Sequence, residues 1–382
     1  MSTPTTTNRQ AGQITALVAL ALWAMAALQP LVWQEAADGT RLPQYLIDLP
    51  PAWLAVLAGL AAAGLGLRPT ARRGSWAGIA LSSLAALGWL QLPPAQASAG
   101  AGAGFWLGVL ALGGLALLSV QRGAALEGRR GDQALAPLLF GLWVIYAWQL
   151  LVVALEVPRV LLPPPALVLE ALRSHAALLG GDFVQTVLKA VLLGWAGGSA
   201  LGFAVAVAID RQPFLQRGLL PIASLTSTIP LVGVAPIAVM WFGFEWPSKA
   251  AVVVLMTFFP MLVSTLAGLK SAGRLERELM YSYAAGYGRT LWSLRLPAAF
   301  PFVVGALKVN ATLALIGAIV AEFFGSPTSG LGFRISTEAA RMNMALVWAA
   351  IAVAALTGSL AYALLVRLER RVAFWHPSVR SR

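Results

Sequence analysis

The sequence predicts an all-α membrane protein that crosses the bilayer about ten times. Of its 382 residues, 59% are hydrophobic and only 11% are charged, whereas a soluble domain carries about 25% charged residues. The apolar residues form continuous stretches of about 20 residues, which is the length of a spanning helix, and they do not alternate with polar residues as in a β-barrel. A polytopic helical fold is therefore expected.

The expected helices follow the apolar stretches in chain order. They lie at about 12–33, 51–67, 75–92, 104–121, 135–156, 183–209, 217–243, 248–268, 300–322 and 344–366. The second stretch is short and rich in glycine, so it defines a span less clearly than the others. A polar, glycine-containing linker at 123–137 separates the first four stretches from the last six.

Basic residues predict the orientation of these helices. Most arginines and lysines fall in alternate loops: Arg9, Arg68, Arg72, Arg73, Arg122, Arg129, Arg130, Arg211, Arg217, the loop 270–297 and the tail from Arg367. Cytoplasmic loops of membrane proteins carry this excess, so both termini and loop 270–297 are expected in the cytoplasm. The net charge of +12 then reflects orientation and not a nucleic-acid partner.

No pattern in the sequence indicates an enzyme. It lacks the glycine-rich phosphate loop that ends in Gly-Lys-Ser/Thr, so we expect no ATPase site on this chain. The two histidines, His175 and His376, fall in loops expected on opposite sides of the membrane, and there is no cysteine. We therefore expect no catalytic residue, no metal site and no cofactor bound by the chain itself.

The polar loop 270–297 interrupts two long apolar stretches. It carries Lys270, Arg274, Arg277, Arg289 and Arg295. Leu279, Tyr283 and Tyr287 recur every four residues, which predicts one shared helical face. Gly286 and Gly288 are expected to end this helix, a second short helix to follow, and Pro297 to stop it. A basic helical hairpin of this kind is typical of a docking element.

This loop resembles the coupling loop of bacterial permeases in importers driven by ATP-binding cassettes. The family pattern is Glu-Ala-Ala, three residues, Gly, nine residues, then Ile-x-Leu-Pro. Counted back from Leu296-Pro297, Glu278 stands at the Glu, Leu279 and Met280 at the two Ala, Ala284 at the Gly, and Leu294 at the Ile. The flanking stretches 227–244 and 296–333 are similar to permeases for sulfonates, taurine, nitrate and thiamine-pyrimidine precursors. The resemblance covers about 135–372.

The resemblance implies an architecture and partners. Residues 1–130 are expected to form a four-helix membrane extension, 131–372 the permease core with coupling loop 270–297, and 373–382 a cytoplasmic tail. The family implies a bacterial inner-membrane permease homodimer, ATPase subunits that bind ATP, and a substrate-binding protein. The residues implied in ATPase coupling are Glu278, Leu279, Tyr283, Ala284, Gly286, Tyr287, Leu296 and Pro297. The expected solute is a thiamine-pyrimidine precursor or riboflavin; a sulfonate, taurine or nitrate is the alternative.

Several residues have two interpretations. Glu278 either contacts the ATPase or simply pairs with Arg274 one turn earlier. Lys308, Asn310, Thr312, Glu322 and Trp241 are candidates for the substrate pathway. The alternatives are snorkelling for Lys308, helix-to-helix hydrogen bonds for Asn310 and Thr312, shaping of the outer gate or binding-protein contact for Glu322, and an interfacial aromatic belt for Trp241.

Two other classes of protein remain open. An ion-coupled secondary transporter is favoured by paired acidic residues within the spans. A membrane-embedded enzyme is favoured by His, Asp or Glu clustered at one membrane face. The sequence contains neither pattern in its apolar stretches.

Overall fold

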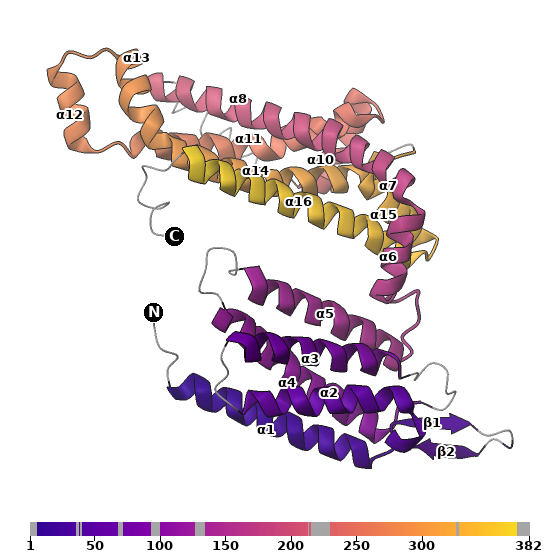
Figure 1. Ribbon diagram of the computed structural model, residues 1–382. Helices are drawn as coiled ribbons and strands as arrows, with labels where there is room; N and C mark the ends of the chain where they lie inside the picture. Colours follow the sequence, from indigo (N-terminus) through magenta and orange to yellow (C-terminus); the bar gives the residue numbers. More distant parts are fainter. Residues whose placement is uncertain are drawn as a thin grey trace. The chain divides into compact units, whose positions relative to one another are not determined.

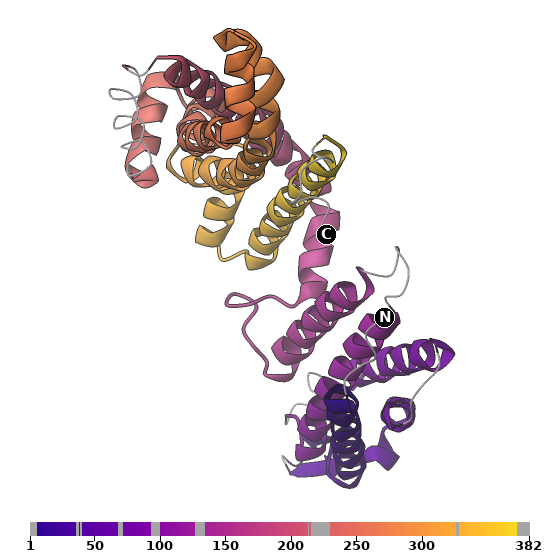
Figure 2. The same ribbon diagram turned by 90° about the vertical axis from the view of Figure 1, so that its left-hand side faces the viewer.

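The computed structural model describes residues 6–35, 38, 40–67, 72–92, 100–126, 134–212, 214, 230–325 and 328–372. The chain divides into two compact units, which we call unit 1 (Met1–Ala166) and unit 2 (Leu167–Arg382). The helices of each unit can be followed in two views (Figures 1 and 2). Each unit is described by itself.

Unit 1 is a helical bundle with one hairpin. Its helices are α1 (Thr6–Leu28), α2 (Pro50–Gly66), α3 (Arg72–Leu90), α4 (Ala103–Leu126) and α5 (Leu135–Ala154). Between α1 and α2 lie the antiparallel strands β1 (Val32–Glu35) and β2 (Arg41–Gln44), in which Val32 is opposite Gln44, and a short helix η1 (Leu46–Asp48). The sequence analysis did not predict this hairpin.

Aromatic side chains form the centre of unit 1. Trp23 packs edge-to-face on Trp89 with ring centroids 5.0 Å apart, and Trp89 stacks on Phe105 at 5.8 Å. All three side chains are fully buried. Such pairs contribute about 0.5–1.5 kcal/mol beyond the burial of their apolar area.

Helix α5 packs with the first four helices. The Trp143 indole N–H donates to Ser119 Oγ at 2.6 Å, and the Tyr146 hydroxyl donates to the Ala86 carbonyl at 2.9 Å. The division between the units therefore follows α5, whereas the linker pattern put the domain limit before it, at 130/131.

Unit 2 contains the longest helices. Its elements are α6 (Pro165–Ser174), α7 (Ala176–Phe183), η3 (Val184–Val191), α8 (Leu192–Arg211), α10 (Leu231–Phe242), α11 (Trp246–Lys270), α12 (Arg274–Ser282), α13 (Tyr287–Thr290), η4 (Leu291–Arg295), α14 (Leu296–Gly325), α15 (Leu331–Ala340) and α16 (Met344–Val372). The segments η3 and η4 are π-helical. Consecutive elements join without a break into two long helices, over 176–211 and 287–325.

The predicted all-α membrane fold is confirmed. In the part of the chain that the structure describes, seven helices are long and apolar enough to cross a membrane, and three shorter apolar helices lie at Ala52–Gly66, Gly74–Leu90 and Gly233–Phe242. These ten coincide with the ten predicted stretches, although the seventh stretch lies partly outside the described residues. The tail 373–382 and residues 127–133 of the linker 123–137 also lie outside them.

Helix α11 is central in unit 2, and small residues let α8 approach it closely. Gly194, Gly198 and Gly202 lie one turn apart on α8 and face α11. A Cβ atom at position 198 would lie 2.0 Å from Thr257 Oγ1 and 2.6 Å from the Val254 carbonyl oxygen. Small residues at this spacing are typical of tight helix packing in membranes, where dispersion contacts hold helices together.

We predict that Gly198→Ala destabilises the protein while Gly197→Ala does not. The added methyl group at 198 overlaps α11 backbone and costs about 1–3 kcal/mol. At position 197 the new Cβ would make only an ordinary 3.5 Å contact with Val254, and alanine favours the helix. Thermal unfolding of both variants in detergent tests this; equal melting temperatures for the two variants would contradict the close approach.

Candidate functional site

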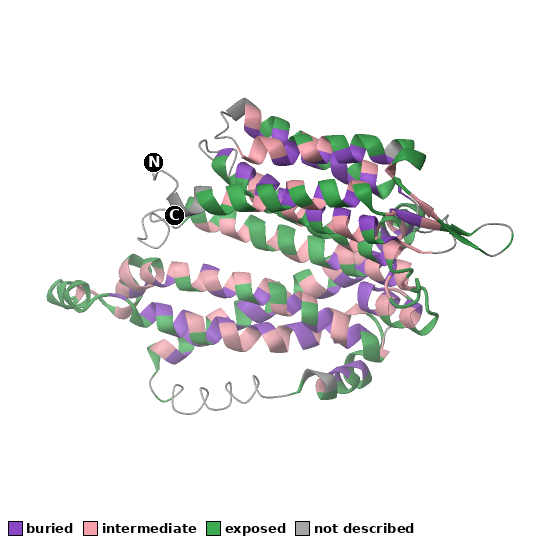
Figure 3. Ribbon diagram, turned by 90° about the horizontal axis from the view of Figure 1, so that it is seen from below, coloured by how far each residue is buried: buried purple, intermediate pink, exposed green. Residues whose placement is uncertain are grey.

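Helix α12 stands at the exposed end of loop 270–297. No residue of α12 is buried, and Figure 3 shows this helix in green, set apart from the long helices of unit 2. Glu278 Oε1 accepts a hydrogen bond from Arg274 Nε at 2.7 Å, and both side chains are solvent-exposed. This is the local i,i+4 pair considered from the sequence. An exposed pair of this kind contributes about 0.3–0.5 kcal/mol.

Apolar side chains on and beside α12 are exposed as well. Leu279 is 56% and Tyr283 77% exposed, and Leu275 and Tyr281 are exposed to a similar degree. We call these four residues, three on α12 and Tyr283 directly after it, the α12 patch. The helix itself is rich in charged residues, so it does not lie within the lipid bilayer. A loop in water that exposes several large apolar groups is suited to bind a protein partner.

Helix α12 ends in a Schellman motif. The Ala284 N–H donates to the Tyr281 carbonyl at 2.9 Å, and the Ala285 N–H donates to the Met280 carbonyl at 3.0 Å. Ala284 has φ +50°, the left-handed conformation that glycine adopts most easily. Ala284 is the residue that stands where the family pattern has glycine. The backbone therefore gives a physical reason for glycine at this position.

The helix break differs from the prediction. It lies at Tyr283–Ala285 and not at the glycines, since Gly286 is an extended residue that precedes α13 and Gly288 lies within α13. Tyr287 consequently belongs to a different helix from Leu279, so the predicted shared face of Leu279, Tyr283 and Tyr287 is wrong. Four-residue spacing carries no information once the helix has ended.

The prediction that Pro297 stops a helix is wrong. Residues 287–325 are helical throughout, so Leu296 and Pro297 lie inside a long helix. The π-helical turn η4 directly precedes Pro297. In a regular α-helix the proline ring would clash with the carbonyl of the preceding turn, and the missing N–H would leave that carbonyl without its hydrogen bond. The wider π-helical turn leaves room for the ring.

Tyr287 and Arg295 anchor the loop to α8. Both terminal nitrogens of Arg295 donate to Asp210, Nη1 to Oδ2 at 2.7 Å and Nη2 to Oδ1 at 2.6 Å. The Tyr287 hydroxyl donates to the same Oδ2 at 2.9 Å, and Arg295 Nε donates to the Leu269 carbonyl at 3.0 Å. The Asp210 side chain is 5% exposed. We call this group the Asp210 cluster.

Asp210 was not among the residues predicted from the sequence. It is an acid at the end of an apolar stretch and is followed by Arg211, while the loop with five basic residues, 270–297, comes two apolar stretches later. A lone acid at the cytoplasmic end of a span, with arginines in another loop expected on the same side, was the available signal.

Two pathway candidates on α14 have partners in neighbouring helices. Lys308 Nζ pairs with Glu369 Oε2 of α16 at 2.7 Å. Asn310 is fully buried, and its Nδ2 donates to Ser199 Oγ at 3.0 Å and to the Thr257 carbonyl at 2.8 Å. Asn310 thus hydrogen-bonds between helices, one of its two interpretations.

Thr312 and Trp241 lie on exposed faces. Thr312 makes no hydrogen bond among the described residues and sits on a different face of α14 from Asn310. Trp241, on α10, is 77% exposed and borders an apolar pocket with Leu201 and Phe258. These positions are compatible with contacts outside the single chain.

Glu322 is buried at the other end of α14. It is 2% exposed and accepts hydrogen bonds from Thr186 Oγ1 and from the Gly332 N–H, both at 2.7 Å. Thr186 Oγ1 in turn accepts from the Leu331 N–H at 2.7 Å. Glu322 therefore holds the start of α15 against η3, and in this conformation it is not exposed to a binding protein.

A second buried acid holds the same loop. Asp182 accepts from the Gly330 N–H and from Arg334 Nε, each at 2.8 Å. Gly330 has φ +134°, where a side chain would be strained. Lys249 Nζ donates to the carbonyls of Phe244 and Gly325. We call this set, together with Glu322 and Thr186, the outer polar cluster.

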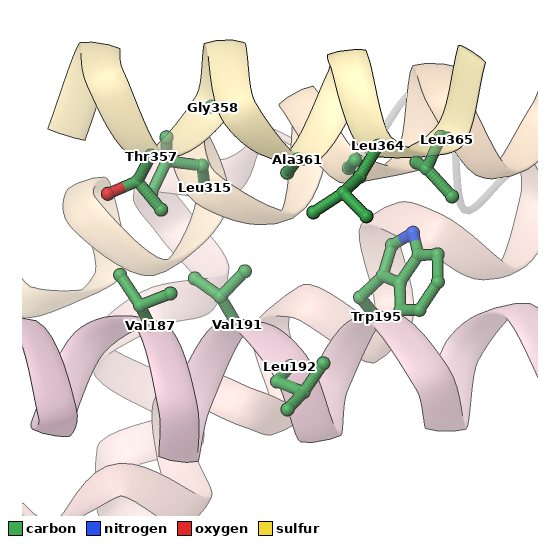
Figure 4. Close-up of a pocket in the computed structure, with 11 residues that line it drawn as sticks. Val187, Val191, Leu192, Trp195, Leu315, Thr357, Gly358, Ala361, Leu364 and Leu365 are labelled. Atoms are coloured by element: carbon green, nitrogen blue, oxygen red, sulfur yellow. The ribbon is translucent and has the colours of Figure 1, made fainter. Parts of the chain in front are cut away.

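An apolar pocket of roughly 230 Å³ lies between three long helices of unit 2. Figure 4 shows Val191 and Trp195 on one wall, Leu315 of α14, and Ala361 and Leu364 of α16. Its only polar side chains are those of Trp195 and Thr357, which donate to the carbonyls of Leu307 and Val353. A pocket without free polar groups cannot orient a polar solute.

No group of three or more His, Cys, Asp or Glu side chains in the described part of the chain is arranged to hold a metal ion.

Comparison with known proteins identifies relatives of unit 2. Residues 171–374 match the family described as "Binding-protein-dependent transport system inner membrane component". The formylaminopyrimidine transport permease protein ThiX of Halalkalibacterium halodurans is 32% identical over 247 residues, 65% of this chain and 98% of that protein. The riboflavin transport system permease protein RibX of Chloroflexus aurantiacus is 32% identical over 234 residues, 60% of this chain and 86% of its own. The taurine transport system permease protein TauC of Escherichia coli is 30% identical over 251 residues, which are 64% of this chain and 89% of that protein.

We predict that Ala284→Gly stabilises the end of α12. A non-glycine residue in the left-handed region costs about 1–2 kcal/mol, partly offset by the greater freedom of glycine in the open state. Amide exchange in α12, followed by mass spectrometry, should become up to about fivefold slower. Ala285→Gly is the matched control: its φ is not positive, so exchange should become faster. Faster exchange in Ala284→Gly would contradict the Schellman geometry.

Proposed function

Because the chain belongs to the family of binding-protein-dependent transport system inner membrane components, we propose a substrate class, an assembly and an orientation for it. It is the permease subunit of an ATP-driven importer, as the resemblance of loop 270–297 predicted, and a multi-pass membrane protein. Its relatives are transport components and not enzymes. This membership sets aside the ion-coupled secondary transporter and the membrane-embedded enzyme.

The proposed substrate is a small uncharged heteroaromatic compound such as a thiamine-pyrimidine precursor, with riboflavin in the same class. The names of two relatives support it, and the similarity to ThiX extends over 98% of that protein. A sulfonate such as taurine is the second candidate. Lys189 on η3 favours that candidate, since it is an exposed cation within a long apolar helix and has no ion-pair partner among the described residues.

Uptake into proteoliposomes that contain the whole importer separates these candidates. We expect labelled formylaminopyrimidine to be taken up, taurine to have no effect on this uptake, and uptake to be unchanged in Lys189→Gln. Uptake of labelled taurine alone, together with loss of that uptake in Lys189→Gln, would replace the heteroaromatic proposal with the sulfonate.

The proposed core begins at α5. Residues 167–382 are too few to supply the 247 residues aligned with ThiX, so the similarity reaches back before unit 2. Helices α5, α8, α10, α11, α14 and α16 are then the six core helices, within the expected limits 131–372. Residues 1–130 are an extension, and both termini lie in the cytoplasm of a bacterial inner-membrane protein.

We further propose a homodimer through α14. Its exposed residues Phe302, Val309, Thr312, Ile316 and Phe323, together with the half-buried Gly305 and Ile319, form a series with spacings of three and four. This period is that of a helix seam that packs against another helix. Gly305 has open space where a Cβ would point, and Thr312 gains a polar partner in such a seam.

The α12 patch is the observation that carries the proposed coupling function. A separate ATPase subunit binds ATP and receives this patch in a groove, and a substrate-binding protein delivers the solute from outside. Exposed apolar groups on a cytoplasmic helical loop are stabilised by such a contact. Glu278 then exchanges its exposed partner Arg274 for a basic group of the ATPase.

We predict that Glu278→Arg combined with Tyr283→Ala strongly weakens ATPase binding without loss of stability. Both side chains are exposed, so the free energy of unfolding should change by less than about 0.5 kcal/mol. Pulldown of the cognate ATPase in detergent should weaken at least tenfold. The control variant carries the same two types of substitution in segments expected on the outer side, Glu170→Arg and Tyr45→Ala. It should bind the ATPase like the unaltered protein.

Equal ATPase binding by the unaltered protein and the Glu278→Arg, Tyr283→Ala variant would show that α12 is not the contact. A drop in melting temperature that matches the loss of binding would assign these side chains a structural role instead.

A further inference from the structure

The two long helices of unit 2, over 176–211 and 287–325, are connected by polar bonds at three levels. We propose that these bonds make them one rigid pair, and that Asp210 is the positioning residue that joins this pair to the coupling loop. The proposal rests on the proposed function, in which the ATPase moves α12.

The first level is the Asp210 cluster. Helix α12 has no buried residue, so a displacement of α12 reaches the membrane helices only through the chain on either side of it. On one side the chain enters α13 and η4, where Tyr287 and Arg295 bind Asp210 at the end of α8. Arg295 also donates to the Leu269 carbonyl, which lies in the last turn of α11. The base of the loop is thus fixed to α8 and α11 together.

The second level lies in the middle of the helices. Asn310 of α14 donates to Ser199 of α8, and the Trp195 indole of α8 donates to the Leu307 carbonyl of α14 at 3.1 Å. The Asn310 bond is buried, where hydrogen bonds are electrostatically stronger than in water.

The third level is the outer polar cluster. Thr186, in the η3 part of the first helix, donates to Glu322 near the end of the second. From Thr186 to Asp210 the helix rises roughly 36 Å, more than the hydrocarbon thickness of about 30 Å. The same two helices are therefore bonded at both ends of a membrane-spanning length.

The consequence is a direct mechanical link between loop and outer cluster. If the Asp210 cluster holds, a push on α12 moves both helices as one body and changes the position of Thr186 and Glu322, which hold the start of α15. If it breaks, α12 still binds the ATPase, but the base of the loop is no longer fixed to the end of α8. Loss of Asp210 should therefore uncouple hydrolysis from transport.

Transport per ATP hydrolysed tests this in the reconstituted importer with its ATPase and binding protein. For Asp210→Asn we expect ATPase binding within twofold of the unaltered protein and a transport-to-ATP ratio at least about fivefold lower. Arg295→Ala should have the same effect, and the double variant should be no worse than either, because both remove one interaction. Glu170→Gln removes an equally negative but exposed charge on α6 and should leave the ratio unchanged.

An unchanged ratio in Asp210→Asn, or a double-variant loss equal to the product of the single losses, would overturn the proposal. Tyr287→Phe keeps the ion pair and removes only the hydroxyl bond, so it tests the cluster if the charge variants do not fold. A smaller loss, about twofold, is expected for it; no loss would also count against the cluster.

A distance measurement on the isolated chain keeps this inference separate from the proposed function. The sequence contains no cysteine, so spin labels at Arg289→Cys on α13 and Leu201→Cys on α8 are the only labels on a chain, and an excess of unlabelled protein limits the measurement to the distance within one chain. We expect one narrow distance distribution, broadened by Asp210→Asn. Narrow distributions in both would overturn the positioning role, whether or not the ATPase binds.

Discussion

The bidentate ion pair between Arg295 and Asp210 is the interaction on which the cytoplasmic end of unit 2 depends. A carboxylate that is 5% exposed is costly to bury unless its oxygens are well satisfied, and here both oxygens accept from one guanidinium while Tyr287 adds a third bond. Breaking such a pair by removing one partner leaves an uncompensated charge. The loop base therefore has one strongly preferred arrangement, while the adjoining α12 has no buried residue.

The same constraint organises the opposite end. Asp182 and Glu322 are both buried, and each accepts from the backbone of the 330–332 segment and from a side chain on another element. The buried acids of unit 2 thus hold the loops that terminate its long helices. Between these ends, contacts are mostly apolar and close, as at Gly198 against α11.

Composition and hydropathy were sufficient to predict the helical membrane fold and the ten apolar helices. The pattern from Glu278 to Pro297, together with the flanking stretches 227–244 and 296–333, was sufficient to identify the family. Finer features depended on interactions that local sequence does not encode. The Schellman end at Ala284 ends α12 before the glycines, and the π-turn before Pro297 lets that helix continue. Asp210 acquires its role only from residues more than 70 positions away. The β1–β2 hairpin was signalled only by Asp38-Gly39 between two four-residue strands, and this turn signal was not used in the prediction.

Unit 1 lies outside the residues 171–374 that match the family, yet here too a buried charged side chain connects two helices near their ends. Arg122 is buried near the end of α4, and its Nη2 donates to the Ala62 carbonyl in the last turns of α2 at 3.2 Å. Gly78 leaves the room that the guanidinium occupies. The helix dipole stabilises a cation near the C-terminal end of a helix. Arg122 therefore stabilises the packing of α4 against α2.

The central claim is that α12 is the surface on which the ATPase acts. Its most direct test is cross-linking from a single cysteine, introduced as Ser282→Cys at the exposed end of α12, to the ATPase subunit in membranes. Ser174→Cys, exposed on α6 and expected on the outer side, is the matched control. The account predicts a cross-link to the ATPase from position 282 and none from position 174. A cross-link from position 174, or none from 282 in a complex that copurifies, would contradict it.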